Sequence, residues 1–92
     1  MKFTKKDVLF SKQAQKQLDY CSQRNKRMHN KIRMIIDDIL EFGYGGHFRP
    51  EMLSGNFSGA CSKEVDKKNR VVFQVKDNKI YITQVMGHYN DH

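Results

Sequence analysis

The residues of this chain that are best suited to chemistry are a carboxylate, a guanidinium, an imidazole and a phenol, from Glu51, Arg70, His88 and Tyr89. RNA carries its own nucleophile, the 2′-hydroxyl. Cleavage then needs a base that accepts the hydroxyl proton, an acid that protonates the departing oxygen, and a cation beside the phosphate. The four side chains match these needs without a metal. They predict cleavage of a phosphodiester, with RNA as the expected substrate of a small basic protein.

His88 is the best candidate for the general acid, because histidine is the side chain that ordinarily titrates near neutral pH. Each residue also has a simpler interpretation. His88 could be a surface histidine near a chain end, and Glu51 a solvated loop acid. Arg70 could pair with Glu64 across a hairpin, and Tyr89 could cover the end of a sheet.

Histidine spacing gives little indication of a metal site. His88 and His92 form H-x-x-x-H, but no helix is expected so near the end of the chain, and no third ligand is evident. His47 with His88 is a conceivable two-histidine pair, but His47 lies in a glycine loop with no evident positioning element. We therefore expect neither a metal nor another cofactor.

Positive charge is concentrated in the first part of the chain. Residues 1–36 contain ten Lys and Arg against two Asp, whereas residues 37–92 contain seven basic and eight acidic residues. This segregation favours contact with a polyanion, and the alternative is a solvated helix surface. The candidates for contact with RNA are Arg27, Lys31, Arg49 and Lys63.

The length of 92 residues predicts one domain, 1–92, whose site is an open groove. Ser11 is a predicted N-cap for a first helix, and an apolar stripe predicts a second helix over residues 26–42, ended by Gly43. The expected strands are residues 8–10, 59–65, 70–75 and 79–85. The predicted class is α+β, with the helical hairpin on one face of a mostly antiparallel sheet.

Strand alternation is expected to place Val71, Phe73 and Val75 on one face of the sheet and Arg70 on the other. The helical hairpin is expected to cover one face and to leave the other for function. Cys21 and Cys61 fall at apolar-periodic positions and are expected to be reduced core residues. Neither a signal peptide nor a membrane span is expected, so the predicted location is the cytoplasm.

Several short motifs follow one another along the chain. They are Arg49-Pro50-Glu51-Met52-Leu53, Asn56-Phe57-Ser58-Gly59, Ser62-Lys63, Asn69-Arg70-Val71-Val72-Phe73 and His88-Tyr89. The chain resembles the YoeB/Txe branch of the RelE toxin superfamily, in which these motifs run approximately K-P-E-x-L, N-L-S-G, S-R-R, H-R-L-V-Y and Y-H-Y. The resemblance covers nearly the whole chain.

This resemblance implies a RelE-like fold and a type II toxin that cleaves mRNA in the ribosomal A site. It implies Glu51 as general base, His88 as general acid, Arg70 as phosphate stabiliser and Tyr89 as an orienting residue. The products would be a 2′,3′-cyclic phosphate and a 5′-hydroxyl. The implied partner, besides mRNA and the ribosome, is an antitoxin of the YefM/Phd kind, and the sequence leaves a homodimer open.

The chain departs from the family pattern at several positions. Ser54 takes the place of a lysine, Glu64 that of the second basic residue of S-R-R, and Asn69 that of the histidine before the arginine. Asn90-Asp91-His92 continue beyond the final tyrosine. These changes keep the four proposed catalytic positions but remove positive charge along the expected path of the substrate.

Two other functions fit the same fold. A ParE-like toxin would inhibit DNA gyrase by binding and would need no acid–base pair. A catalytically weak module would bind RNA or the ribosome without cleaving it. The joint presence of Glu51, Arg70, His88 and Tyr89 favours the nuclease.

Overall fold

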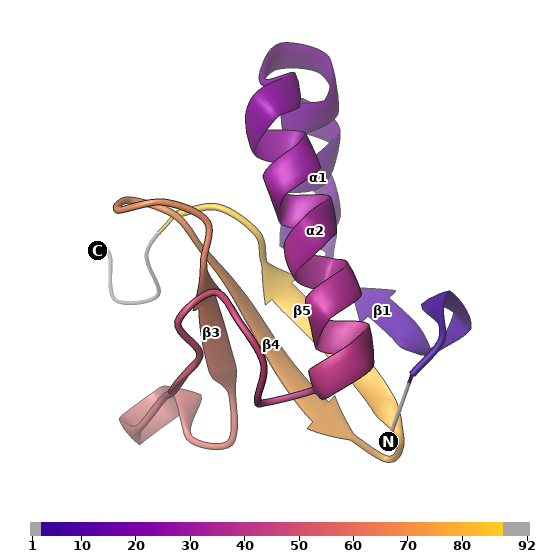
Figure 1. The fold of residues 1–92 in the computed structure, drawn as a ribbon, viewed down its shortest axis with the longest axis vertical. Coiled ribbons are helices and arrows are strands. Elements are labelled where there is room, and N and C mark those ends of the chain that lie inside the picture. Colours follow the sequence, from indigo (N-terminus) through magenta and orange to yellow (C-terminus); the bar gives the residue numbers. More distant parts are fainter. Residues whose placement is uncertain (1–2, 88–92) are drawn as a thin grey trace.

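The computed structural model describes residues 3–87, with the backbone alone for Phe57. Two helices pack on one five-stranded sheet, and the α1–α2 connection projects beyond the strands (Figure 1). The elements, in chain order, are η1 (Lys5–Asp7), β1 (Val8–Phe10), α1 (Lys12–Arg24), α2 (Lys26–Phe42), β2 (Glu51–Met52), η2 (Gly55–Phe57), β3 (Cys61–Glu64), β4 (Arg70–Lys76) and β5 (Lys79–Gln84). The predicted α+β class is confirmed.

Local signals account for the helix bounds. The Ser11 hydroxyl accepts a hydrogen bond from the Ala14 N–H at 3.0 Å and so caps α1. The Asn25 side chain caps α2 in the same way, through the Met28 N–H at 3.1 Å. Gly43 ends α2 at a φ of 60°, which glycine adopts without a steric penalty. Both predicted helices are confirmed.

The sheet has the order β1-β5-β4-β3-β2. β1 pairs parallel with β5, and the other neighbours are antiparallel. Asp77 and Asn78 have φ values of 54° and 62°, which suit the two-residue turn between β4 and β5. β2 was not predicted, because two residues are too few to show a strand pattern.

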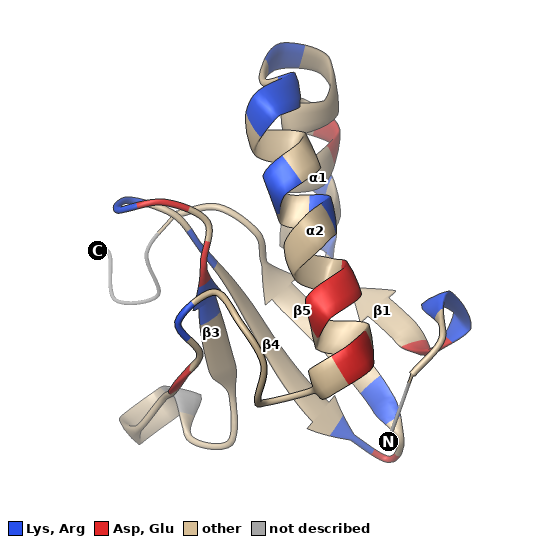
Figure 2. Cartoon of the chain, viewed as in Figure 1, with Lys and Arg blue, Asp and Glu red and all other residues tan. Residues whose placement is uncertain are grey.

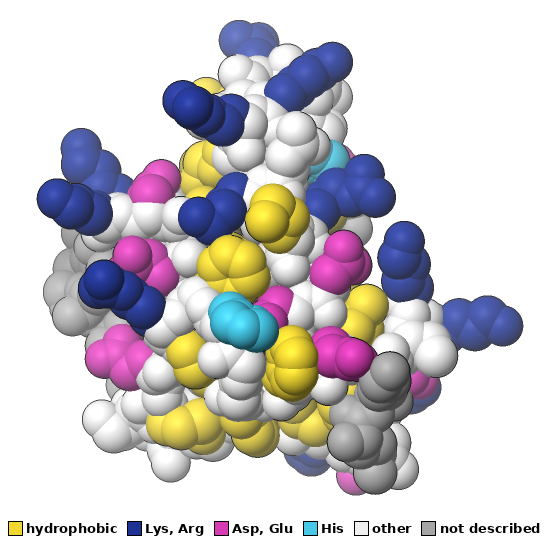
Figure 3. Space-filling view, viewed as in Figure 1, with side chains coloured by type: hydrophobic (Ala, Val, Ile, Leu, Met, Phe, Trp, Pro, Cys, Tyr) yellow, Lys and Arg dark blue, Asp and Glu magenta, His cyan; other side chains and the backbone are white. Residues whose placement is uncertain are grey.

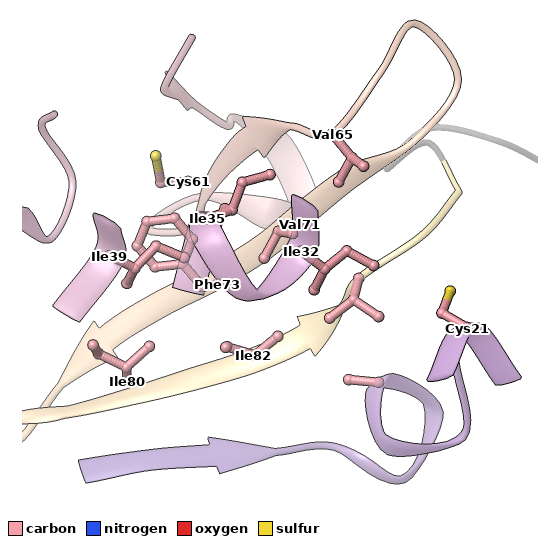
Figure 4. Close-up of a cluster of buried hydrophobic side chains, with 12 residues drawn as sticks. Cys21, Ile32, Ile35, Ile39, Cys61, Val65, Val71, Phe73, Ile80 and Ile82 are labelled. Atoms are coloured by element: carbon pink, nitrogen blue, oxygen red, sulfur yellow. The ribbon is translucent and has the colours of Figure 1, made fainter. Parts of the chain in front are cut away.

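The core lies between α2 and the central strands. Ile32, Ile35 and Ile39 of α2 lie over Val71 and Phe73 of β4 (Figure 4). The two cysteines are also fully buried, as predicted, and burial raises the pKa of each thiol. Because Val71 and Phe73 face the helices, the alternating residues of β4 face the other side of the sheet.

Within residues 3–87, the structure has no helix that combines the length and the apolar character needed to cross a membrane.

Candidate functional site

Arg70 lies at the start of β4 and is held by protein groups on several sides. Its Nε donates to the Ser62 hydroxyl at 2.7 Å, and its Nη2 donates to the Arg49 carbonyl at 2.8 Å. The longest contact joins Nη1 to the Glu64 carboxylate at 3.4 Å. The side chain is 11% exposed. The guanidinium is therefore fixed in orientation, and its Nη1 is the donor that the protein holds least tightly.

Glu51 shares the Arg70 face of the sheet. It is exposed on β2, directly opposite Ser62 on β3. Side chains of directly opposed residues in an antiparallel pair lie on the same face, about 4.5–5.5 Å apart at Cβ. Since the Ser62 hydroxyl contacts Arg70, Glu51 and Arg70 lie on the same face of the sheet, opposite the helices, with Ser62 as their shared neighbour.

Arg49 lies just before β2 in a left-handed conformation, with a φ of 51°. Its carbonyl accepts the Arg70 hydrogen bond, and its side chain is exposed. The preceding Phe48 carbonyl accepts the Glu64 N–H at 2.7 Å. This short segment therefore runs along the edge of β3 and places Arg49 beside Arg70.

Gly87, the last residue that the structure describes, also contacts Arg70. The Arg70 N–H donates to the Gly87 carbonyl at 3.0 Å, and the Gly87 N–H donates to the Asn69 side chain at 2.7 Å. Asn69, where the family pattern has histidine, thus helps to fix the residue that precedes His88. His88 and Tyr89 themselves lie outside the described residues.

Lys63 was expected to contact RNA, and this expectation is wrong. Its side chain is fully buried, and its ammonium donates to the Asp38 carboxylate and, at 2.6 Å, to the Gly45 carbonyl. The cause is strand alternation, which turns Lys63 toward the helices and its neighbours Ser62 and Glu64 away from them. The apolar residues Cys61 and Val65, two positions on either side of Lys63, are the sequence signal that could have shown this.

Asp38 and His47 form an interaction that sequence reasoning missed. The His47 backbone N–H and imidazole Nδ1 both meet the Asp38 carboxylate, with Nδ1 at 2.8 Å. Burial opposes ionisation of Asp38, but hydrogen bonds from Lys63 and His47 outweigh it, so the pKa of this carboxyl lies below its ordinary value. Asp38 therefore joins α2, β3 and the loop that leads to Glu51. His47 does have a positioning element, contrary to expectation.

Tyr44 anchors the same loop, residues 43–50, to β4 through its hydroxyl and its ring. The Tyr44 hydroxyl accepts the Val75 N–H at 2.8 Å, and its ring stacks on Phe73.

The loop also requires glycine at residue 46. At Gly46 the φ is 82°, and a Cβ there would lie 2.8 Å from the Phe42 Cβ. Glycine is required at this position because both the backbone conformation and the close approach exclude a side chain.

Arg27 and Lys31 lie on α2, away from the face that carries Glu51 and Arg70. Arg27 is exposed, and the Lys31 ammonium lies 5.5 Å from the centre of the Phe48 ring. Basic residues gather on the upper half of the helical hairpin and at the tip of the β3–β4 turn (Figure 2). The structure thus separates these two RNA-binding candidates from the Arg70 neighbourhood.

No metal site is evident in the part of the chain that the structure describes. Residues 3–87 contain no group of three or more His, Cys, Asp or Glu side chains placed to hold an ion.

Comparison with solved structures shows which class of protein has this fold. A chain of the YoeB–YefM complex from Staphylococcus aureus superposes with a TM-score of 0.84 at 32% identity, over 97% of this chain and 100% of that chain. The YoeB dimer from the same organism superposes at 0.82 with 33% identity, over 90% and 97%. The fold is that of the YoeB and RelE toxins.

The family follows from the sequence match. Residues 10–89 match the family described as the YoeB-like toxin of bacterial type II toxin-antitoxin systems. Toxin YoeB of Escherichia coli strain K12 is 28% identical over 82 residues, which cover 89% of this chain and 98% of that protein. The chain belongs to the YoeB-like toxin family and is a toxin of the type II toxin–antitoxin class.

Proposed function

We propose that this toxin is an endoribonuclease that cleaves mRNA on the ribosome by metal-free acid–base catalysis. The observation that supports this most directly is the shared neighbourhood of Glu51, Ser62 and Arg70, with Gly87 hydrogen-bonded to Arg70. A candidate base and a fixed cation then lie on one face of the sheet, and the chain leads from Gly87 to the general acid candidate.

In the proposed reaction, Glu51 accepts the proton of the RNA 2′-hydroxyl, and the 2′-oxygen forms a bond to phosphorus. Arg70 stabilises the negative charge that develops on the phosphoryl oxygens. The bond from phosphorus to the 5′-oxygen breaks, and His88 donates its proton to that oxygen. Tyr89 orients the base or the phosphate. The products are a 2′,3′-cyclic phosphate and a 5′-hydroxyl.

The proposed partners are mRNA, the ribosome and an antitoxin of the YefM/Phd kind. Support for the antitoxin comes from the similar S. aureus chain, which was solved as a YoeB–YefM complex, and a YoeB dimer from S. aureus leaves a homodimer open. The exposed Arg49 side chain, beside Arg70, is proposed to contact the RNA backbone.

Analysis of the cleaved ends tests the proposed chemistry. Purified toxin, incubated with ribosomes and a defined mRNA, is expected to give fragments with a 2′,3′-cyclic phosphate and a 5′-hydroxyl, and His88→Ala is expected to give none. A parallel DNA supercoiling assay should show no inhibition of gyrase. Intact transcripts together with inhibited gyrase would replace the nuclease proposal with a ParE-like activity.

Glu64 is expected to weaken substrate binding, because its carboxylate lies 3.4 Å from Arg70 Nη1, where a phosphate would bind. Removal of this charge by Glu64→Gln should lower the KM for RNA about two- to fivefold, which corresponds to the interaction energy of a partly exposed ion pair. The comparison variant is Asp77→Asn, which removes an exposed acid from the distant β4–β5 turn. An equal KM for the two variants would contradict this role for Glu64.

A further inference from the structure

A groove lies between the first half of α2 and the β3–β4 turn. Its volume is about 400 Å³, and Arg27, Lys31, Met28 and Met34 line its α2 side, with Val65 and Asp66 opposite. Figure 3 shows basic side chains on both sides of this part of the surface, on the helical hairpin and on the turn at the left. Of the two proposed catalytic residues that the structure describes, neither Glu51 nor Arg70 lines this groove.

The chemistry of the groove suits a nucleotide. Its thioether and aliphatic side chains offer apolar surface to a sugar or base, and its cationic side chains offer ion pairs to phosphates. Lys67 and Lys68 are exposed at the tip of the turn and extend the positive charge beyond Asp66. The Asp66 carboxylate opposes this charge, but it is engaged by the turn, where it accepts the Lys68 and Asn69 N–H groups at 2.8 Å.

The groove is joined to the candidate site by one short hairpin. Val65 and Asp66 form a wall of the groove, and Arg70 follows the same turn on β4. The turn also holds Gly87 through Asn69. A path from Arg70 to the groove therefore runs around the tip of this turn, where Lys67 and Lys68 are exposed.

We propose that this groove binds nucleotides that flank the cleaved phosphate on the same RNA strand. The proposal rests on the proposed nuclease function, and it adds a second contact that lengthens the bound segment. Arg27 and Lys31 contact backbone phosphates there, with Lys67 and Lys68 between the groove and Arg70. The positive charge of the groove supplies affinity without selecting a sequence.

Binding of short RNA oligonucleotides of increasing length tests this proposal. The probes carry 2′-O-methyl groups throughout, so they lack the nucleophile and report binding even if the protein has no nuclease activity. Affinity, measured by fluorescence anisotropy, should rise with length until the groove is filled. In Arg27→Gln/Lys31→Gln the long probes should lose this gain, whereas the shortest probes should bind as they do to the unmodified protein.

The salt dependence gives the expected size of the effect. Log K falls with log salt, and each phosphate contact that is lost makes this slope shallower by about 0.7 for a single strand. The groove variant, with two contacts removed, should therefore show a slope that is shallower by about 1.4. Lys12→Gln/Lys16→Gln is the matched control, because it removes two charges at the same spacing from the exposed surface of α1.

Three results would overturn the proposal. The first is an equal loss of affinity in the control, which would show a general charge effect. The second is a groove variant that binds long probes normally. The third is a groove variant that keeps RNA affinity but loses binding to an acidic antitoxin peptide, which would assign the groove to the antitoxin. Normal probe binding without cleavage of natural RNA would count against the proposed nuclease activity but not against the binding of RNA in the groove.

Discussion

Asp38→Asn is expected to destabilise this protein by about 3–5 kcal/mol, because it leaves the buried ammonium of Lys63 without a counter-charge. This loss is large relative to the free energy of unfolding of a typical domain, which is about 5–15 kcal/mol. Denaturant unfolding, followed by circular dichroism, measures it. Asp37→Asn is the matched control, since it changes the neighbouring, exposed acid of the same helix. An equal free energy of unfolding for the two variants would contradict a buried ion pair.

A compensating double variant separates loss of the pair from loss of packing. Replacement of both partners, by Asp38→Leu with Lys63→Met, removes the two buried charges together and should recover most of the stability. The loop should still be looser, because the His47 N–H and imidazole lose their acceptor. A double variant as unstable as Asp38→Asn alone would show that shape, rather than charge, holds this region.

Acid should remove the same stabilisation. The folded-state pKa of Asp38 lies below the value of about 3.9 for an unperturbed aspartate, so its contribution is complete above that value. It is lost as the pH falls through the lower, folded pKa. The difference in stability between the unmodified protein and Asp38→Asn should therefore shrink below pH of about 4.

Glu51→Gln is expected to reduce the rate of RNA cleavage by about 10²–10⁴-fold, because the amide cannot accept the 2′-hydroxyl proton. Stability should change little, since Glu51 is exposed on β2. Single-turnover cleavage of a defined mRNA on ribosomes measures the rate, and Asp77→Asn is the control for loss of an exposed acid. Cleavage at the rate of the control would remove Glu51 from the proposed mechanism.

Binding of RNA gives an internal check on the Glu51 result. If Glu51 acts as a base, the variant should bind a 2′-O-methyl probe as tightly as the unmodified protein does, since the lost step follows binding. A parallel loss of affinity and rate would instead indicate that Glu51→Gln disturbs the Arg70 neighbourhood through Ser62.

Much of the fold could be predicted because its signals are local. The cap at Ser11, the isoleucine stripe of α2 and the turn at Asp77 and Asn78 depend on residues a few positions apart. The predicted strand over residues 59–65 was longer than β3, which is Cys61–Glu64. Gly59 has a φ of 93°, outside the extended region, so the ladder begins after it.

The candidate site could be predicted only in part. The sequence alone determined the helices, the main strands and the residue types available for acid–base chemistry, because short-range periodicity and motif order specify them. The tertiary structure decided that Glu51 and Arg70 share a face through Ser62, and that Lys63 is buried on Asp38 rather than free for RNA. Burial of a charge depends on a partner 25 residues away and on which side of the strand is covered, and neither is a property of the local sequence.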